Sequence, residues 1–133
     1  MGLIYREEKN FTPEELEKLF LSVEWASGKF PQKLVAAMRG YDFVYSARDE
    51  GRLAGLACAM DDGVMTAYVH YLLVLPEYQG RGIGRRLADA VREHYADYLK
   101  IVLVASPEKE GFYSKLGYKV AGGTPMSLTE MED

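Results

Sequence analysis

A glycine-rich turn near the middle of the chain holds the residues best suited to chemistry. It contains three glycines and three arginines, Gly80, Gly82, Gly84, Arg81, Arg85 and Arg86. If a helix begins here, its first turn has unpaired backbone N–H groups and a dipole that favours an anion. Glycines let a bulky polyanion approach the backbone, and arginines add positive charge beside a phosphate. The turn therefore predicts a phosphate or pyrophosphate site.

The residues around this turn predict the elements that position it. The continuous apolar run Leu72–Leu75 is typical of a buried strand. Pro76 ends that strand because it has no backbone N–H to donate. After the turn, apolar residues recur at helical spacing, at Ile83, Leu87, Val91 and Tyr98. The turn thus joins a buried strand to an amphipathic helix.

Two common phosphate-binding patterns do not fit this turn. A P-loop requires G-x-x-x-x-G-K-[ST], which the sequence lacks. A dinucleotide-binding pattern starting at Gly80 has Arg85 where its third glycine belongs. Taken alone, the residues also allow a glycine-rich corner with no ligand. The pattern that fits is Q-x-x-G-x-G, formed by Gln79, Gly82 and Gly84 after L-x-V-x-P-E-Y. This stretch resembles motif A of the GNAT superfamily of acyl-CoA-dependent N-acetyltransferases.

The resemblance implies a binding mode for acetyl-CoA as cosubstrate, without a metal. The strands at Leu72–Val74 and Ile101–Ala105 would splay apart, and the pantetheine arm would pair with β-strand backbone in the gap. The pyrophosphate would lie on the N–H groups from Gln79 to Arg85. Ser106 stands where many relatives carry asparagine. The implied contacts are Leu72, Leu73, Val74, Gln79, Gly80, Arg81, Gly82, Ile83, Gly84, Arg85 and Ser106.

A second motif suggests a catalytic tyrosine. Phe112-Tyr113-x-x-x-Gly117-Tyr118 is similar to the family's F-Y-x-x-x-G-F, with Tyr118 in place of the last phenylalanine. By that match Tyr113 faces the thioester sulfur. A phenol titrates near ~10 and a thiol near ~8.5, so full proton transfer is uphill by about 2 kcal/mol. Tyr113 is therefore predicted to donate a hydrogen bond to the leaving thiolate; the alternative is a core aromatic.

Amine acetylation also needs a base, because only the neutral amine attacks. His70 precedes the L-x-V run and matches a histidine that looks catalytic in the arylalkylamine branch of the family. Its ordinary pKa near 6.5 suits this task. It is equally compatible with a plain sheet position, and Tyr68 or a water chain are alternative bases. Trp25, Phe30 and Tyr68 are the candidate substrate contacts, although both Trp25 and Phe30 also suit a core.

Composition narrows the class of protein. The 133 residues suffice for one domain, predicted to span 1–133, and the 48% hydrophobic and 27% charged residues are typical of a globular protein. The net charge of −4 argues against a nucleic-acid partner. The lone cysteine, Cys58, is expected in the core. No apolar run approaches a membrane span, so a cytoplasmic monomer or homodimer is expected.

The remaining patterns predict the element order β-α-α-β-β-β-α-β-α-β-β. Thr12, Pro13 and Glu15 form a capping box with proline at the first helical position. The predicted strands are 2–6, 41–48, 52–60, 64–75, 100–105, 118–121 and 125–129. The predicted helices are 13–23, 31–38, the one after Gly82, and one capped by Ser106 that runs to residue 116. The tail 130–133 is expected to fray.

Hairpins followed by a strand–helix–strand crossover indicate an α/β protein, an α+β mixed sheet with helices on its faces. This is also the element order of the GNAT acyl-CoA N-acyltransferase fold. The expected function is an acetyl-CoA-dependent N-acetyltransferase that acts on a primary amine, in a small molecule or a protein, by direct transfer in a ternary complex. A non-catalytic acyl-CoA-binding or interaction module on the same fold is the alternative, and other acyl donors stay open.

Overall fold

Five strands form one mixed sheet in the order β1-β2-β3-β4-β5. The computed structural model describes residues 2–129 of the chain. The first four strands pair antiparallel, and β5 lies parallel to β4 after the crossover. Their bounds are β1 Leu3–Glu7, β2 Phe43–Asp49, β3 Arg52–Asp61, β4 Thr66–Val74 and β5 Lys100–Leu103. The expected mixed sheet is confirmed.

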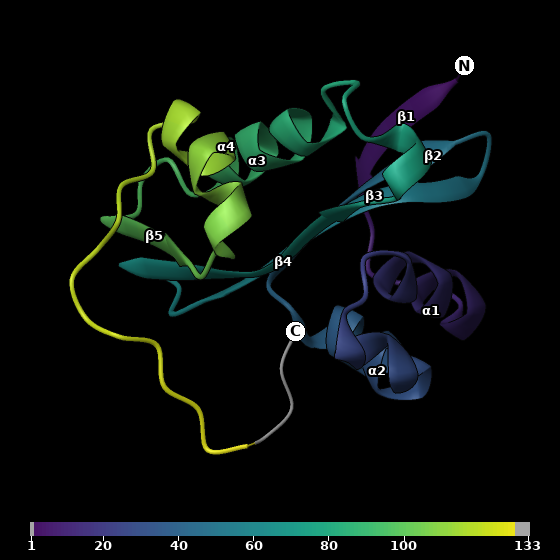
Figure 1. Cartoon of the computed structure of the whole chain (residues 1–133), viewed down its shortest axis with the longest axis horizontal. Coiled ribbons are helices and arrows are strands. Elements are labelled where there is room, and N and C mark those ends of the chain that lie inside the picture. Colours follow the sequence, from purple (N-terminus) through teal and green to yellow (C-terminus); the bar gives the residue numbers. More distant parts are fainter. Residues whose placement is uncertain (1, 130–133) are drawn as a thin grey trace.

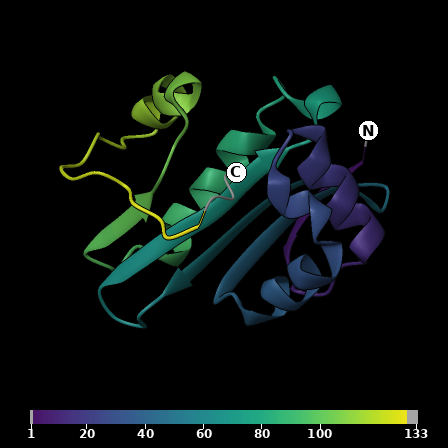
Figure 2. The same cartoon turned by 60° about the horizontal axis from the view of Figure 1, so that its bottom comes forward.

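Helices cover both faces of the sheet, as Figures 1 and 2 show. The helices α1 and α2 lie on one face, and α3 and α4 lie on the other. The α-helices are α1 Pro13–Ser22, α2 Pro31–Gly40, α3 Ile83–His94 and α4 Glu110–Lys115. Three short 3-10 turns are η1 Ala26–Lys29, η2 Pro76–Tyr78 and η3 Pro107–Lys109. Among the helices described, none is long and apolar enough to cross a bilayer.

The first helix begins where the capping box predicts. The Thr12 hydroxyl accepts from the Glu15 amide at 3.2 Å, and the Glu15 carboxylate accepts from the Thr12 amide at 2.9 Å. These two contacts satisfy two of the amides that a helix start leaves unpaired. Leu16, Leu19 and Phe20 of α1 are fully buried against the sheet. Cys58, at the centre of β3, is also fully buried, as expected.

An ion-pair network joins β2 to α1 and to the segment after β1. The guanidinium of Arg48 donates to Glu8 at 2.7 Å and to Glu15 at 2.8 Å. All three side chains are largely shielded from solvent. Burial disfavours ionisation of Glu8, but hydrogen bonds from Arg48, Ser46 and Arg6 outweigh it and lower the pKa of Glu8. The network therefore depends on Glu8 staying ionised.

Two irregularities in β4 shape the region of the predicted site. In the pairing with β3, Cys58 faces Tyr71 and Ala59 faces Val69, so His70 is the additional residue of a β-bulge. The pairing of β4 with β5 runs from Thr66 to Val69 and stops there, because β5 ends at Leu103 while β4 continues. The strands therefore separate beyond Val69, as the splay expected from the resemblance requires.

The short helix α4 ends in a Schellman motif. Gly117 has a φ of +98°, which favours glycine. Its amide donates to the carbonyl of Ser114, and the Tyr118 amide donates to the carbonyl of Tyr113, both at 3.0 Å. Gly117 therefore terminates the helix, as predicted.

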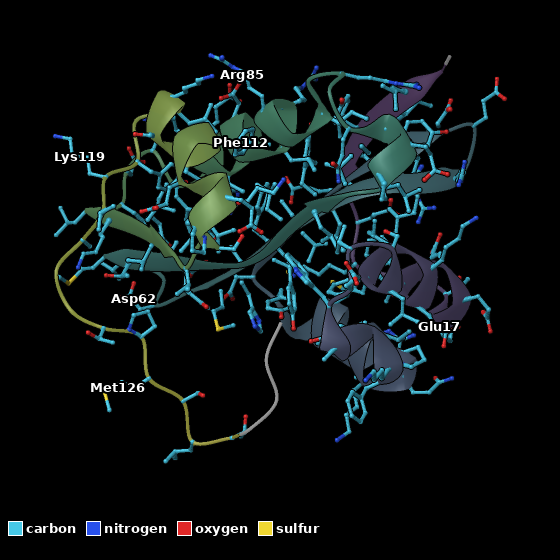
Figure 3. All side chains as sticks on the ribbon, in the orientation of Figure 1. Glu17, Asp62, Arg85, Phe112, Lys119 and Met126 are labelled. Carbon is cyan, nitrogen blue, oxygen red and sulfur yellow. The ribbon has the colours of Figure 1, made fainter. Side chains whose placement is uncertain are left out.

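The two closing strands predicted at 118–121 and 125–129 are wrong. Residues 118–129 pair with no strand; they pass outside β5 and then leave the sheet on the face that carries α1 and α2, at a distance from both helices (yellow in Figures 1 and 2). Val120, Met126 and Leu128, the large apolar residues of these segments, are 85%, 92% and 105% exposed, and Met126 points away from the body of the molecule in Figure 3. Side chains that bury nothing cannot offset the entropy cost of ordering a strand.

The structure differs from the predicted elements in two smaller respects, after α1 and after β5. Between the two helices predicted at 13–23 and 31–38, residues Ala26–Lys29 form the 3-10 turn η1. Ser106 makes no side-chain capping bond, so the helix predicted to start there is a 3-10 turn followed by the six-residue α4. The tail 130–133, expected to fray, lies outside the described residues.

Candidate active site

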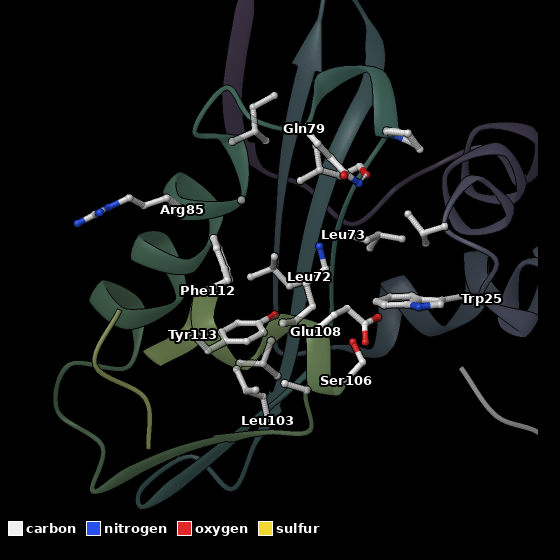
Figure 4. A pocket seen from close by; sticks show the side chains of 18 of the residues that line it. Trp25, Leu72, Leu73, Gln79, Arg85, Leu103, Ser106, Glu108, Phe112 and Tyr113 are labelled. Carbon is white, nitrogen blue, oxygen red and sulfur yellow. Dashed lines mark hydrogen bonds between the residues drawn. The ribbon is translucent and has the colours of Figure 1, made fainter. Parts of the chain in front are cut away.

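A cavity of about 650 Å³ opens where β4 and β5 separate. Figure 4 shows it from close by, with side chains from the β4 edge, the glycine turn, the end of β5 and α4 around it. Of the residues predicted to contact acetyl-CoA or to act in catalysis, most line this cavity: His70, Leu72, Leu73, Val74, Gln79, Gly80, Gly82, Ile83, Gly84, Arg85, Ser106 and Tyr113. The splay thus brings together residues from β4, the glycine turn, the loop after β5 and α4.

The glycine turn has the backbone geometry that an anion site requires. Gly80 and Gly82 adopt φ values of +79° and +84°, which favour glycine. The first hydrogen bond within α3 runs from the Arg86 amide to the Gly82 carbonyl at 3.0 Å. The amides of the three residues before Arg86 consequently have no partner within the helix. They stand at the positive end of the helix dipole, on the wall of the cavity.

Gln79 and Gly84, the first and last residues of the Q-x-x-G-x-G pattern, hold the turn in shape. The Gln79 side-chain amide donates to the carbonyl of Val74 at 3.0 Å, and its backbone amide donates to Pro76 at 3.2 Å. Gln79 therefore fixes the turn to the end of β4. A Cβ atom on Gly84 would stand 3.4 Å from the ring of Phe112, so Gly84 lets α3 and α4 pack closely.

Of the three arginines, Arg85 lines the cavity, whereas Arg86 and Arg81, the latter a predicted cosubstrate contact, do not. Arg85 lines it, but in Figure 4 its guanidinium points away from the centre, and it is 4.0 Å from Asp89. Arg81 lies 5.2 Å from the centroid of the Tyr78 ring. Arg86 stacks on the ring of Tyr5 at 4.5 Å, on the far side of the turn. A negative ligand would thus meet backbone amides first and flexible cationic side chains around them.

Tyr113 lines the cavity from α4, and its hydroxyl points inward in Figure 4. Its ring makes edge contacts with Phe112 and Tyr118, at centroid distances of 5.0 and 5.6 Å. Burial, and to a smaller degree the neighbouring Tyr118, raise the pKa of Tyr113 to about 12. The phenol is therefore protonated at neutral pH and can donate a hydrogen bond.

His70 reaches the cavity from the opposite face of the sheet. Its ring stacks on that of Tyr71 at 4.0 Å, although the two residues are consecutive, because the bulge places both on one face. Tyr71 packs against Phe20 of α1, which identifies this face as the one under α1 and α2. The hydroxyl of Tyr41 lies 2.6 Å from Nδ1 of His70.

The three predicted substrate contacts lie in different places. Trp25 lines the main cavity and packs against Tyr71, with ring centroids 5.6 Å apart. Phe30 is 45% exposed and lines a smaller neighbouring cavity of about 250 Å³. Tyr68 lies beside His70, at a centroid distance of 5.7 Å, but lines neither cavity.

Sequence reasoning missed two groups at this site. The sequence pattern places Tyr41 only at the start of a predicted strand, and its contact with His70 joins residues 29 positions apart, which no local pattern reveals. Glu108 and Lys109 line the mouth of the cavity after β5. Their position next to Ser106 was the available signal, because loops that follow a splayed strand line the gap.

Comparison with known proteins identifies the family. A family model described as acetyltransferase (GNAT) domain matches residues 7–127. The chain belongs to this family. The GNAT domain is 30% identical over 118 residues to the uncharacterized N-acetyltransferase ycf52 of Pyropia yezoensis, a match that covers 83% of the chain and 66% of that protein. The chain spans 60–66% of the length of the three curated relatives with this name.

Solved structures share the fold of this GNAT domain at low identity. A GNAT family acetyltransferase from Streptococcus pneumoniae superposes with a TM-score of 0.77 at 22% identity, covering 96% of this chain and 100% of the other. The aminoglycoside N-acetyltransferase AAC(6')-Iy, solved in complex with CoA, gives 0.74 at 16% identity, covering 97% and 95%. The predicted family and fold class are confirmed.

Proposed function

We propose that this GNAT domain transfers an acetyl group from acetyl-CoA to a primary amine, directly, in a ternary complex. The observation that carries the proposal is the cavity between β4 and β5, which Tyr113 and His70 both line, Tyr113 from α4 and His70 from the opposite face of the sheet. The cavity is continuous with the unpaired amides at the start of α3. One end therefore suits a pyrophosphate, and the other suits thioester chemistry.

The cosubstrate would bind through backbone groups. Its pyrophosphate would accept from the amides of the Gly80–Arg85 turn, whose positive φ values turn the backbone toward the cavity. Its pantetheine amides would pair with the edge of β4 that β5 leaves after Val69. Related structures support this choice, since the fold neighbour AAC(6')-Iy was solved with CoA.

The reaction would proceed by direct attack. The ammonium of the acceptor first loses a proton to His70, and the neutral amine then attacks the thioester carbonyl carbon. The C–N bond forms, the C–S bond breaks, and the electron pair of that bond leaves on sulfur as a thiolate. The protonated hydroxyl of Tyr113 stabilises the negative charge as it develops. After C–N bond formation the nitrogen still carries two hydrogens; one leaves as a proton to water, and the other stays on the amide product.

Tyr41 would select the tautomer of His70 that can act as a base. Burial raises the pKa of Tyr41 well above its ordinary value, so its hydroxyl stays protonated. That hydroxyl also hydrogen-bonds the side chain of Cys58. If its single proton is donated to the sulfur of Cys58, its oxygen accepts Nδ1–H of His70. The imidazole Nε2 then carries the lone pair that takes up a proton.

The deciding experiment measures binding and turnover together. Calorimetry should show tighter binding of acetyl-CoA than of acetyl-pantetheine, which lacks the pyrophosphate. A panel of primary amines with acetyl-CoA, followed by release of free thiol, should show turnover with at least one amine. Tight acetyl-CoA binding without turnover for any amine would favour the non-catalytic acyl-CoA-binding module. Equal affinity for the two donors would remove the argument from the glycine turn.

A variant isolates the role of Tyr41. Tyr41→Phe keeps the ring in its buried position but removes the contact with Nδ1 of His70. Without that contact the Nδ1–H and Nε2–H tautomers mix, so kcat should fall about two- to tenfold and the acidic limb of the pH profile should move. An unchanged profile in a folded variant would refute the assignment.

A further inference from the structure

A second cavity lies beside the first, on the face of the sheet under α1 and α2. Its volume is about 250 Å³. Its floor is formed by buried side chains of Ser27, Leu34, Tyr41 and Tyr71, which are 4–8% exposed. The hydroxyls of Ser27 and Tyr71 bond each other at 2.7 Å. The floor therefore presents mainly ring faces and aliphatic carbon to whatever binds there.

His70 connects the two cavities, because it lines both of them. A molecule held in the second cavity would therefore reach the imidazole from the side of α2. A thioester in the first cavity would reach the same imidazole from the gap between β4 and β5. This is the arrangement that direct transfer needs, since the base must touch the amine beside the acetyl carbon.

The residues at the rim of the second cavity favour some charges on a bound molecule over others. Phe30 and Lys33 form the exposed edge, and the Lys33 ammonium lies 5.6 Å from the centroid of the Phe30 ring. None of the described residues that line this cavity carries a carboxylate. A second cationic group on the bound molecule would thus meet a like charge at the rim, whereas an anionic group would be attracted.

The volume of the second cavity limits how large a bound molecule can be. Cavities that hold drug-sized ligands have volumes of roughly 300–1,000 Å³, so 250 Å³ suits a group about the size of one ring. We propose that the second cavity binds the acceptor, and that the acceptor is a primary monoamine with a compact, ring-sized apolar body whose far end is uncharged or anionic. This inference rests on the proposed acetyltransferase function, which it makes specific. Polyamines and other polycations are excluded as preferred acceptors.

Three amines built on one ring test this class. They are 4-methylbenzylamine, 4-(aminomethyl)benzoate and 1,4-bis(aminomethyl)benzene, which share the reacting aminomethyl group and differ at the far end. We expect the neutral and anionic compounds to have higher kcat/KM than the diamine, after halving the diamine value for its two equivalent amines. The separation should be about two- to fivefold, because Lys33 is solvent-exposed and its charge is screened.

Two variants of rim residues and one matched control connect the preference to the rim. Lys33→Glu should reverse the order of the anionic and dicationic compounds, a swing of about tenfold in their kcat/KM ratio. Lys29→Glu is the matched control: it makes the same charge change on the neighbouring turn η1, but Lys29 does not line the cavity. Phe30→Ala should raise KM for all three compounds by about fivefold with little change in kcat.

The outcomes separate this inference from the proposed function. Turnover that favours the diamine in the wild type, or a preference that Lys33→Glu and Lys29→Glu change equally, would overturn the inference and leave the acetyltransferase proposal standing. Turnover with long polyamines alone would do the same. Absence of turnover with every amine, together with tight acetyl-CoA binding, would instead overturn the proposed function and with it the inference.

Discussion

Replacement of Tyr113 by phenylalanine is the sharpest test of how this domain would work. The ring makes the packing contacts with Phe112 and Tyr118, and Tyr113→Phe retains it. The variant should therefore fold normally. What it loses is one hydroxyl that projects into the cavity between β4 and β5.

The structure sets the size of the expected loss. With its pKa at about 12, Tyr113 is ionised in only about one molecule in ten thousand at pH 8. Transfer of its proton to a thiolate whose acid titrates near ~8.5 would be uphill by about 5 kcal/mol. In the proposed mechanism the hydroxyl would consequently act as a hydrogen-bond donor that keeps its proton. Removal of one such donor typically lowers kcat by about 10²-fold or more, equivalent to about 3 kcal/mol.

The assay is steady-state turnover with an accepted amine, beside a direct titration with acetyl-CoA. Affinity should change little, because a thioester sulfur is a weak acceptor before reaction and the contact strengthens only as charge develops. Tyr118→Phe is the matched control, since it removes a neighbouring phenol that does not line the cavity. Equal turnover in wild type and Tyr113→Phe, with chemistry rate-limiting, would show that Tyr113 is only a packing residue. Equal losses in both variants would point to a structural effect.

Three further predictions test the anion site, the base and the stability of the fold. Gly82→Ala should weaken acetyl-CoA binding and lower the stability of the fold by ~1–2 kcal/mol. Gly63→Ala, at a similar φ of +86° in a remote turn, should lower stability by the same amount and leave binding unchanged. Equal effects of the two variants on binding would refute the anion site. His70→Gln should move or abolish the acidic limb of the kcat/KM profile, and an unchanged limb would assign the proton to another group. Arg48→Gln should destabilise the fold by about 3 kcal/mol at pH 7 in thermal or urea unfolding. The pKa of Glu8 is lowered in the folded state, so its ion pair with Arg48 stabilises the fold at pH values above the unfolded-state pKa. That stabilisation disappears as the pH falls and Glu8 becomes protonated, so the destabilisation caused by Arg48→Gln should shrink below about pH 4. A destabilisation independent of pH would contradict this.

Local signals in the sequence predicted most of the fold. The capping box at Thr12 and Glu15 and the glycine stop at Gly117 act within one helical turn, so they could be recognised without tertiary information. The apolar run before Pro76 likewise marked β4. The predicted strands after residue 118 failed for the complementary reason. Whether alternating residues form a strand depends on an available partner edge and on burial, and both are properties of the whole fold.

The residues of the candidate site also differ in whether a local sequence pattern could predict them. The glycine turn and Tyr113 belong to compact motifs, and the structure places both at one cavity. The partner of His70, Tyr41, comes from the end of α2 and meets it only because the sheet brings β4 under that helix. Nothing in the spacing of these two residues predicts a contact. The position of Lys33 at the second cavity could not be predicted from the sequence either, because the fold alone brings it there.

The bulge in β4 explains how one strand can serve both cavities. In a regular strand, His70 and Tyr71 would point to opposite faces, because side chains alternate with a period of two. The additional residue at position 70 places both rings on the face of α1 and α2, stacked 4.0 Å apart. Tyr71 can then pack into the core against Phe20 while His70 stays at the surface between the cavities. Beyond the bulge the alternation resumes, and Leu72 and Leu73 line the gap that β5 leaves open. A single inserted residue thus places the proposed base on a strand whose other positions hold the core and the proposed cosubstrate edge.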